Sequence, residues 1–234
     1  MIVLLESFVE SLTVVLPFYP VGTMERVTVE GQVATGSTYA RMLSHLPLAA
    51  RPTRLMVYDV HTLQNRFYLS SGVIASLCTT VPLVVPMFRE VGVTCVAFPD
   101  DGAAKRFGTM FQGFPLVTCG KTRQGDERIV TINSGDCKGL DVCIVDDLVQ
   151  TGGTLFEAGK ALRDAGAKSV SAFVVHAVFP GEGWRRFLRG GDRAIFERFF
   201  LTNSNPTRVA EIPEGDTFVV VDITEKVLLD IDRF

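Results

Sequence analysis

Short apolar runs alternate with segments of helical periodicity along most of the chain. The apolar runs are rich in β-branched and aromatic residues, and this pattern predicts strands at 12–18, 54–60, 93–98, 116–119, 142–145, 170–178, 195–201 and 218–223. Helical spacing of apolar residues predicts helices at 35–46, 82–91, 103–110, 155–165 and after 223, and a short one at the start of the chain through Leu4, Leu5, Phe8 and Leu12. Strands that alternate with helices in this way predict a mostly parallel α/β sheet.

The most informative segment is 140–155, with the sequence LDVCIVDDLVQTGGTL. Its first half predicts a buried strand that ends at Asp146 and Asp147, and its second half predicts a Gly-rich loop, 151–154, that opens a helix. Backbone N–H groups and the positive end of the helix dipole suit a phosphate at such a loop. The acidic pair suits sugar hydroxyls or a divalent cation, and an ordinary helix cap is the structural alternative.

Other polar residues also follow predicted strands. Asp59 and His61 lie at the end of the strand predicted at 54–60, and Asp100 follows the strand predicted at 93–98. Because the carboxyl ends of parallel strands meet at one edge, we expect these residues and the acidic pair to converge on a site. His61 is a candidate contact to a metal or a nucleotide, with a polar strand end as the alternative. Asp100 is a candidate Mg²⁺ ligand, with an Asp helix cap as the alternative. His176 lies in an apolar strand and is predicted to be a hydrogen-bonded core residue.

Lys121 and Arg123 fall in a polar stretch, 120–127, that we expect to be a mobile loop. A solvated charged turn is the plain explanation of this stretch, whereas phosphoryl transfer needs cations that a closing loop brings onto the moving phosphates. The sequence contains no G-x-x-x-x-G-K-[ST], so any ATP would be bound without a P-loop.

Composition narrows the class of protein. The chain has 234 residues, 47% of them hydrophobic and 21% charged, as in an ordinary globular protein. Its net charge of -3 argues against nucleic acid as the main partner, and no apolar run is long enough to cross a membrane. Five cysteines without a C-x-x-C suit reduced thiols, so we expect a cytoplasmic protein.

Several stretches, taken in chain order, resemble the ribose-phosphate pyrophosphokinases, which make phosphoribosyl diphosphate (PRPP). Asp59-Val60-His61 with Gln64 resembles the family's D-L-H-x-x-Q stretch, and Phe98–Arg106 resembles its S-P-D-x-G-x-x-K-R stretch. Lys121 and Arg123 match the K-x-R of its flexible loop, and Val145–Thr154 matches V-D-D-x-x-D-T-x-G-T. Val175-His176-Ala177 resembles T-H-G, and Thr202-Asn203-Ser204 resembles T-N-T. Plain phosphoribosyltransferases share only the PRPP loop. The sequence around 16–26 and 149–153 looks like the plant, phosphate-independent class.

The resemblance implies a fold and a reaction. It implies two phosphoribosyltransferase-type, Rossmann-like domains with parallel sheets: an incomplete first domain, 1–82, against which 222–234 packs, and a second domain, 83–221. The implied reaction moves the diphosphate of ATP onto ribose 5-phosphate, giving PRPP and AMP for nucleotide biosynthesis, with Mg²⁺ as cofactor.

The resemblance also implies roles for particular residues. It implies that Lys121 and Arg123 are catalytic, that His61 and Asp100 lie at the metal, and that Glu25, Arg26 and His61 contact the nucleotide. The implied ribose 5-phosphate site comprises Asp146, Asp147, Gln150, Thr151, Gly152, Gly153 and Thr154.

The chain departs from the family in two ways. Gln150 replaces a third acidic residue of the sugar-binding stretch, and the family's opening F-x-D-G-E segment has no counterpart. We therefore expect an uncovered sheet edge, stronger binding of ribose 5-phosphate than of ATP, and assembly with identical chains or with full-length synthetase subunits. The alternatives are a non-catalytic regulatory subunit of such synthetases and, with less support, a phosphoribosyltransferase.

Overall fold

The computed structural model describes residues 9–45, 49–124 and 127–233, and between 121 and 129 it describes only the backbone. The chain forms two compact units, Met1–Thr79 and Thr80–Phe234, which are considered separately below. The helix predicted at the start of the chain lies largely outside the described residues. The sequence-based division after residue 82, with 222–234 returning to the first domain, stays a prediction.

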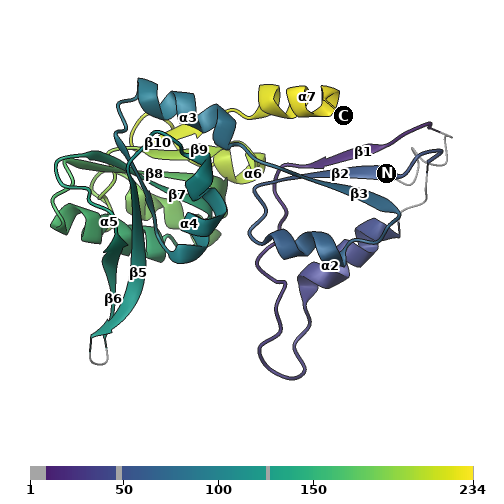
Figure 1. Ribbon diagram of the computed structural model, residues 1–234, viewed down its shortest axis with the longest axis horizontal. Helices are drawn as coiled ribbons and strands as arrows, with labels where there is room; N and C mark the ends of the chain where they lie inside the picture. The colour runs from purple at the N-terminus through teal and green to yellow at the C-terminus, as the bar shows by residue number, and fades with distance from the viewer. Residues whose placement is uncertain (1–8, 46–48, 125–126, 234) are drawn as a thin grey trace. The chain divides into compact units, whose positions relative to one another are not determined.

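The first unit contains a small parallel sheet in the order β1-β2-β3 (Figure 1). Its elements are β1 (Thr13–Leu16), α2 (Thr35–Ser44), β2 (Thr53–Tyr58), the 3-10 helix η1 (Leu63–Tyr68) and β3 (Val73–Cys78). Leu55 and Val57 of the central strand pack with Leu43 of α2 and with Tyr19 in one apolar cluster. Burial, and then the nearby Tyr39, raise the pKa of Tyr19 to about 12, so this hydroxyl stays protonated within the core.

The second unit is built on a larger sheet with the strand order β10-β9-β8-β7-β4-β5-β6. Its strands are β4 (Cys95–Phe98), β5 (Leu116–Gln124), β6 (Glu127–Ser134), β7 (Asp141–Val149), β8 (Ser169–Ala177), β9 (Phe199–Thr202) and β10 (Phe218–Val221). Every neighbouring pair is parallel except β5 and β6, which form an antiparallel hairpin that projects from the sheet in Figure 1. The parallel α/β sheet predicted from the alternating pattern is confirmed.

Helices cover both faces of this sheet. They are α3 (Val81–Glu90), α4 (Asp101–Phe107), the 3-10 turn η2 (Gly108–Met110), α5 (Gly153–Asp164), η3 (Pro180–Phe187) and α6 (Pro206–Val209). The last helix, α7 (Thr224–Asp232), follows β10 and extends away from the sheet in Figure 1. Successive residues of a strand point to opposite faces, so Val142 and Ile144 pack with α5, whereas Cys143 and Val145 pack with α3 and α4. The run of apolar residues in β7 is therefore explained by burial on both sides.

The structure differs from the sequence-based expectations in several elements. The polar stretch around Lys121 was expected to be a loop, but β5 and β6 extend on both sides of it as paired strands. The strand β3 and the helix η1 were not expected, and they fill the interval between Val60 and α3. The strand β9 begins at Phe199 rather than at Ile195.

The cysteines are free thiols, and four of the five are buried. Burial is the largest cause that raises the pKa of Cys95 to about 11 and that of Cys119 to about 12, and burial also raises the pKa of Cys137 and Cys143. These thiols are therefore protonated at neutral pH and act as small apolar side chains of the core.

Candidate functional site

The Gly-rich segment after β7 forms a tight turn that leads directly into α5. Gly152 is the N-cap residue of α5 and has φ of 70°, a left-handed conformation that favours glycine. The Phe156 amide donates to the Gly152 carbonyl at 3.0 Å, and this is the first hydrogen bond of the helix. The amides of the preceding residues, Gly153, Thr154 and Leu155, have no partner within the helix. The structure thus places a row of backbone donors at the residues from which the sequence predicted a phosphate site.

Two side chains from outside the predicted motif support this turn. An added β-carbon on Gly152 would lie 2.4 Å from Cζ of Phe187, so the ring of Phe187 packs directly against the glycine backbone. The guanidinium of Arg193 donates a hydrogen bond of 2.7 Å from Nη1 to the Thr151 carbonyl. Both residues were missed from the sequence, because Phe187 ends the 3-10 helix η3 and Arg193 lies in the irregular segment that follows it, and neither stretch carries a recognisable pattern.

The acidic pair lies within β7 and not beyond its end, which corrects the sequence-based expectation. The strand continues to Val149, and Asp146 is aligned with Val174 of β8. An oxygen of Asp146 accepts a hydrogen bond of 2.9 Å from the Asp147 amide. Asp146 is half-buried, and Asp147 is buried with 6% of its surface exposed. The half-buried Asp146 and the buried Asp147 therefore differ in how readily a ligand from solution can reach them.

A buried polar cluster lies on the neighbouring strands β8 and β9. Thr202 Oγ1 and Ser204 Oγ donate to the Val175 carbonyl at 2.7 and 3.0 Å, and Ser204 Oγ lies 2.9 Å from Nδ1 of His176. The imidazole of His176 and the Ser204 hydroxyl are therefore hydrogen-bonded to each other inside the unit. His176 is only 2% exposed, so the prediction of a hydrogen-bonded core histidine is confirmed.

The predicted catalytic residues lie on the hairpin. Lys121 is paired with Val130 and Arg123 with Arg128 in the antiparallel register of β5 and β6. The side chains of this part of the hairpin lie outside the described residues. Positions two apart on a strand share a face, so the backbone places Lys121 and Arg123 on the same side of β5.

Asp100 follows β4, the strand next to β7, and so lies at the same edge of the sheet as the Gly-rich turn. It is the N-cap residue of α4, and its Oδ1 accepts a hydrogen bond of 2.9 Å from the Ala103 amide. The helix-cap role is therefore real, and it occupies one of the two carboxylate oxygens. Among the described residues, no three His, Cys, Asp or Glu side chains are arranged to hold a metal ion by themselves.

The first unit carries the residues that were predicted to contact the nucleotide. Glu25 is buried and pairs with Nε of Arg26 at 3.1 Å, while its backbone carbonyl accepts a hydrogen bond of 2.9 Å from the Tyr68 hydroxyl. Asn65 of η1 also donates to the Gly22 carbonyl at 3.0 Å. These two bonds fix the loop that bears Glu25 and Arg26 against η1, which follows the exposed His61.

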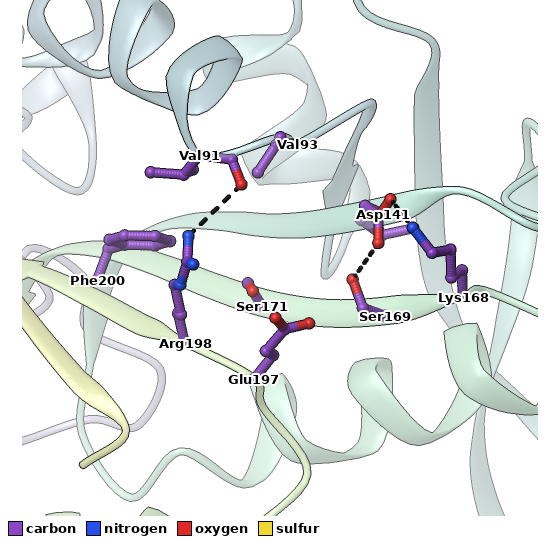
Figure 2. Close-up of a pocket in the computed structure, with 11 residues that line it drawn as sticks. Val91, Val93, Asp141, Lys168, Ser169, Ser171, Glu197, Arg198 and Phe200 are labelled. Carbon is purple, nitrogen blue, oxygen red and sulfur yellow. Dashed lines mark hydrogen bonds and ion pairs between the residues drawn. The ribbon is translucent and has the colours of Figure 1, made fainter. Parts of the chain in front are cut away.

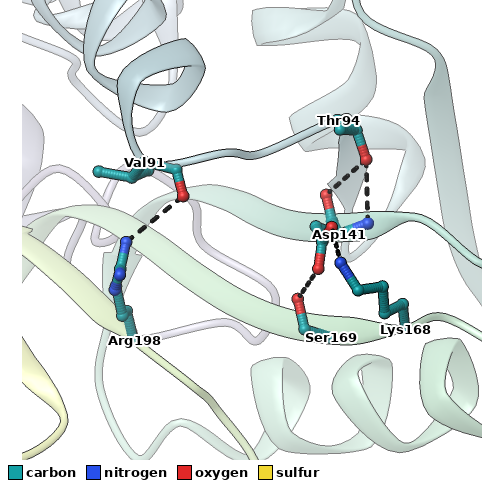
Figure 3. Close-up of polar contacts among 6 residues, drawn as sticks. All are labelled: Val91, Thr94, Asp141, Lys168, Ser169 and Arg198. Atoms are coloured by element: carbon teal, nitrogen blue, oxygen red, sulfur yellow. Dashed lines mark hydrogen bonds and ion pairs between the residues drawn. The ribbon is translucent and has the colours of Figure 1, made fainter.

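A pocket of about 240 Å³ lies at the opposite edge of the larger sheet, where the strands begin (Figure 2). Its walls include Asp141 at the start of β7, Ser169 at the start of β8 and Arg198 just before β9. Most of its polar groups hold the sheet edge together (Figure 3). The Asp141 carboxylate accepts hydrogen bonds from Lys168 at 2.8 Å and from Ser169 at 2.7 Å, and Arg198 donates to the Val91 carbonyl at 3.4 Å. None of the residues that were predicted to bind a ligand lines this pocket.

The structure thus brings part of the predicted site together. The segment from Asp146 to Thr154 and Asp100 share the carboxyl edge of one sheet, and β5, the strand beside β4, leads to Lys121 and Arg123. No helix in the described part of the chain is long and apolar enough to span a membrane.

Known protein families contain similar sequences. The sequence profile of the phosphoribosyl transferase domain matches residues 80–187. The chain is 45% identical to ribose-phosphate pyrophosphokinase 4 of Oryza sativa subsp. japonica over 224 residues, which cover 92% of this chain and 69% of that protein. It is 44% identical to ribose-phosphate pyrophosphokinase 4 of Arabidopsis thaliana, over 92% of this chain and 66% of that protein. It is 42% identical to the mitochondrial ribose-phosphate pyrophosphokinase 3 of Spinacia oleracea, over 92% of this chain and 55% of that protein. The chain therefore spans between about half and two thirds of the length of these relatives.

A solved structure has a similar fold. The crystal structure of phosphoribosylpyrophosphate synthetase from Mycobacterium smegmatis matches 95% of this chain and 71% of its own chain, with a TM-score of 0.76 and 25% sequence identity. The likeness extends over both compact units, so the first unit as well as the second has the local architecture of that protein.

Proposed function

Because the chain belongs to the ribose-phosphate pyrophosphokinase family, we propose that it transfers the terminal diphosphate of ATP to the 1-hydroxyl of ribose 5-phosphate, with PRPP and AMP as products. The observation that carries the proposal within this chain is the turn at Gly152, which presents the first amides of α5 to an anion. The product serves nucleotide biosynthesis.

The 5-phosphate of the sugar would bind at the start of α5. The amides of Gly153 and Thr154 would donate to phosphate oxygens, and the hydroxyls of Thr151 and Thr154 would add two further donors. No side chain caps this helix among the described residues, so a bound anion does not have to displace a protein group. The left-handed Gly152 is what turns the backbone toward the phosphate.

The ribose hydroxyls would bind to the acidic residues at the end of β7, just before the phosphate turn. Asp146 is half-exposed and lies closest to solvent, so it is the better placed of the two carboxylates to accept hydrogen bonds from the sugar. The buried Asp147 would fix the backbone that carries its neighbour. Gln150 is exposed at the end of the strand and can offer its amide to the sugar or its phosphate without adding a third negative charge.

Mg²⁺ would bind with the diphosphate of ATP. Mg²⁺ takes one or two carboxylates and completes its shell with water and substrate phosphates. Asp100 suits this role, because the helix cap uses only its Oδ1. In the first unit, the exposed His61 is proposed as a metal-binding residue in its own right, and with Glu25 and Arg26 it would contact the nucleotide. When bound, the ion would neutralise the charge that the phosphates share.

Lys121 and Arg123 would act on the moving diphosphate. They share one side of β5 on a hairpin at the edge of the sheet, and cations there can offset the negative charge that develops in the transition state. Alignment of the two substrates by the sites described above would add to this effect, and the best intramolecular reactions gain about 7–11 kcal/mol in that way.

A coupled assay for AMP release tests the proposal. We expect AMP to form only when ATP, ribose 5-phosphate and Mg²⁺ are all present, and we expect Gly153→Val to abolish it. Gly108→Val is a matched control, because that glycine has a helical backbone conformation and an added β-carbon would lie 3.9 Å from its nearest neighbours, which is ordinary van der Waals contact. A chain that binds ribose 5-phosphate but releases AMP only with a full-length synthetase added would be a regulatory or incomplete subunit. A chain that consumes PRPP and a free base would be a phosphoribosyltransferase.

Assembly and location are also proposals. Both outer strands of the three-stranded sheet, β1 and β3, are edges within the described residues, and a sheet edge can pair with another chain. We therefore propose that the protein forms an oligomer with identical chains or with longer synthetase subunits, which sedimentation can test.

Free thiols support a reducing compartment such as the cytoplasm, although one relative is named mitochondrial. Fractionation of cells that express the protein tests the location.

A further inference from the structure

In the irregular segment before β9, the side chain of Arg193 hydrogen-bonds to the predicted phosphate loop. Nη1 of Arg193 donates to the Thr151 carbonyl at 2.7 Å, and an added β-carbon on Gly153 would lie 3.9 Å from the same nitrogen. The two groups are separated by 42 residues in the sequence. We propose that Arg193 is a positioning residue that holds the phosphate loop open for ribose 5-phosphate and lends it positive charge. This inference rests on the proposed function.

The surroundings of Arg193 hold its side chain in place. Its guanidinium carbon lies 5.5 Å from the ring centroid of Phe156 and 6.0 Å from that of Phe187. Phe156 belongs to α5, and Phe187 is the residue that packs against Gly152. Cation–π contacts with both rings fix the guanidinium beside the loop and reduce the number of rotamers that it can adopt.

The backbone around Arg193 is also fixed. The Arg193 amide donates a hydrogen bond of 2.8 Å to the Arg186 carbonyl. Nε of Arg186 in turn donates to both carboxylate oxygens of Asp192, at 3.0 and 3.1 Å. An added β-carbon on Gly191 would lie 2.3 Å from the Arg186 carbonyl oxygen, so the turn is closed as tightly as a glycine allows. The hydrogen bonds from Arg186 are the largest cause that lowers the pKa of Asp192, and the charge of Arg193 makes a smaller contribution, so the guanidinium of Arg193 remains bonded to the loop.

The charge of Arg193 indicates a ligand. The N-terminus of a helix carries a partial positive charge, so a cation beside it is unfavourable in the absence of an anion. Arg193 nevertheless lies next to Gly153, the first residue of α5. An anion bound at that terminus interacts favourably with both the helix dipole and the guanidinium. The Thr151 carbonyl would repel a bound phosphate, and its hydrogen bond to Arg193 directs it toward the guanidinium instead.

Calorimetric titration of the purified chain with ribose 5-phosphate and, separately, with ribose tests this role. We expect Arg193→Gln to weaken ribose 5-phosphate binding about tenfold, equivalent to about 1.4 kcal/mol, and to leave binding of unphosphorylated ribose and of ATP unchanged. Arg193→Lys keeps the charge but loses the planar fork, so we expect it to recover part of the affinity. Arg198→Gln is the matched control, because Arg198 lies at the other edge of the sheet, where it donates a hydrogen bond to the Val91 carbonyl.

The outcomes separate the two claims. Normal binding of ribose 5-phosphate by Arg193→Gln would overturn the role of Arg193 and leave the proposed function standing. Equal losses in Arg193→Gln and Arg193→Lys, with ribose and ATP affinity lowered as well, would mean a general structural role and would also overturn it. A wild-type chain that binds no ribose 5-phosphate would overturn both claims. In steady-state kinetics the predicted signature is a higher KM for ribose 5-phosphate with kcat little changed.

Discussion

The ring of Phe187 occupies the space that a side chain at Gly152 would need, with Cζ 2.4 Å from the position of an added β-carbon. Gly152 is also left-handed, with φ of 70°, so two independent constraints require glycine there. We expect Gly152→Ala to lower the free energy of unfolding by about 1–3 kcal/mol in urea denaturation. Gly139→Ala is the control, since Gly139 has φ of 73° but no atom within 4 Å of an added β-carbon. Equal losses in the two variants would show that Phe187 does not restrict the turn.

Thr154 is predicted to hold the 5-phosphate through its hydroxyl. Thr154→Ala should weaken ribose 5-phosphate binding by about 1.5–3 kcal/mol, the usual worth of a hydrogen bond to a charged group. Titration calorimetry measures the change, with the exposed Thr109→Ala as the control. Unchanged affinity in Thr154→Ala would remove this hydroxyl from the site.

Lys121 is predicted to act mainly on the transition state. Lys121→Ala should lower kcat by roughly 10²–10³-fold, as expected for the loss of a group that stabilises developing charge. Steady-state kinetics with both substrates varied gives the answer, and the exposed Lys138→Ala serves as control. If KM rose while kcat stayed the same, Lys121 would be a binding residue.

Asp141 lies at the edge of the sheet opposite the phosphate turn, and its ionisation should make the free energy of unfolding depend on pH. Hydrogen bonds from Lys168 and then Ser169 hold the pKa of this carboxyl below its ordinary value. The folded state therefore gains stability from the ionised group above the unfolded pKa of about 3.9, and loses it as the pH falls through the lower folded value. We expect Asp141→Asn to destabilise the protein by up to about 1 kcal/mol at pH 7, since its partner Lys168 is largely exposed, and by less near pH 3.

Urea denaturation at both pH values measures this difference, with Asp232→Asn at an exposed site as the control. A deficit in Asp141→Asn that stayed constant from pH 7 to pH 3 would show that ionisation of Asp141 does not contribute.

The phosphate turn could be predicted because its signal is local. Strand, glycine pair and helix follow one another within 140–155, and each depends on neighbours in the sequence. The end of β7 was predicted less accurately, because polar residues such as Asp146 and Asp147 usually end a strand. Pairing with β8 carries the strand on to Val149, and such a partner is not visible in a local pattern.

The residues that were missed depend on distant contacts. Arg193 reaches the turn across 42 residues, and the segment around it has neither regular apolar spacing nor a motif. The hairpin of β5 and β6 was mistaken for a loop, because its charged and polar residues lack the alternation of a half-buried strand. Both misses arise where tertiary pairing, and not the local sequence, determines the conformation.

Phosphorus NMR of a reaction with ATP, Mg²⁺ and ribose 5-phosphate is the most direct test of the central claim, because it shows which bond of ATP is broken. We predict that the three signals of ATP are replaced by that of AMP and by two coupled signals of a diphosphate on carbon 1 of the sugar, beside the unchanged 5-phosphate. Formation of ADP with a sugar bisphosphate, or of ADP with free phosphate, would contradict diphosphate transfer by this protein.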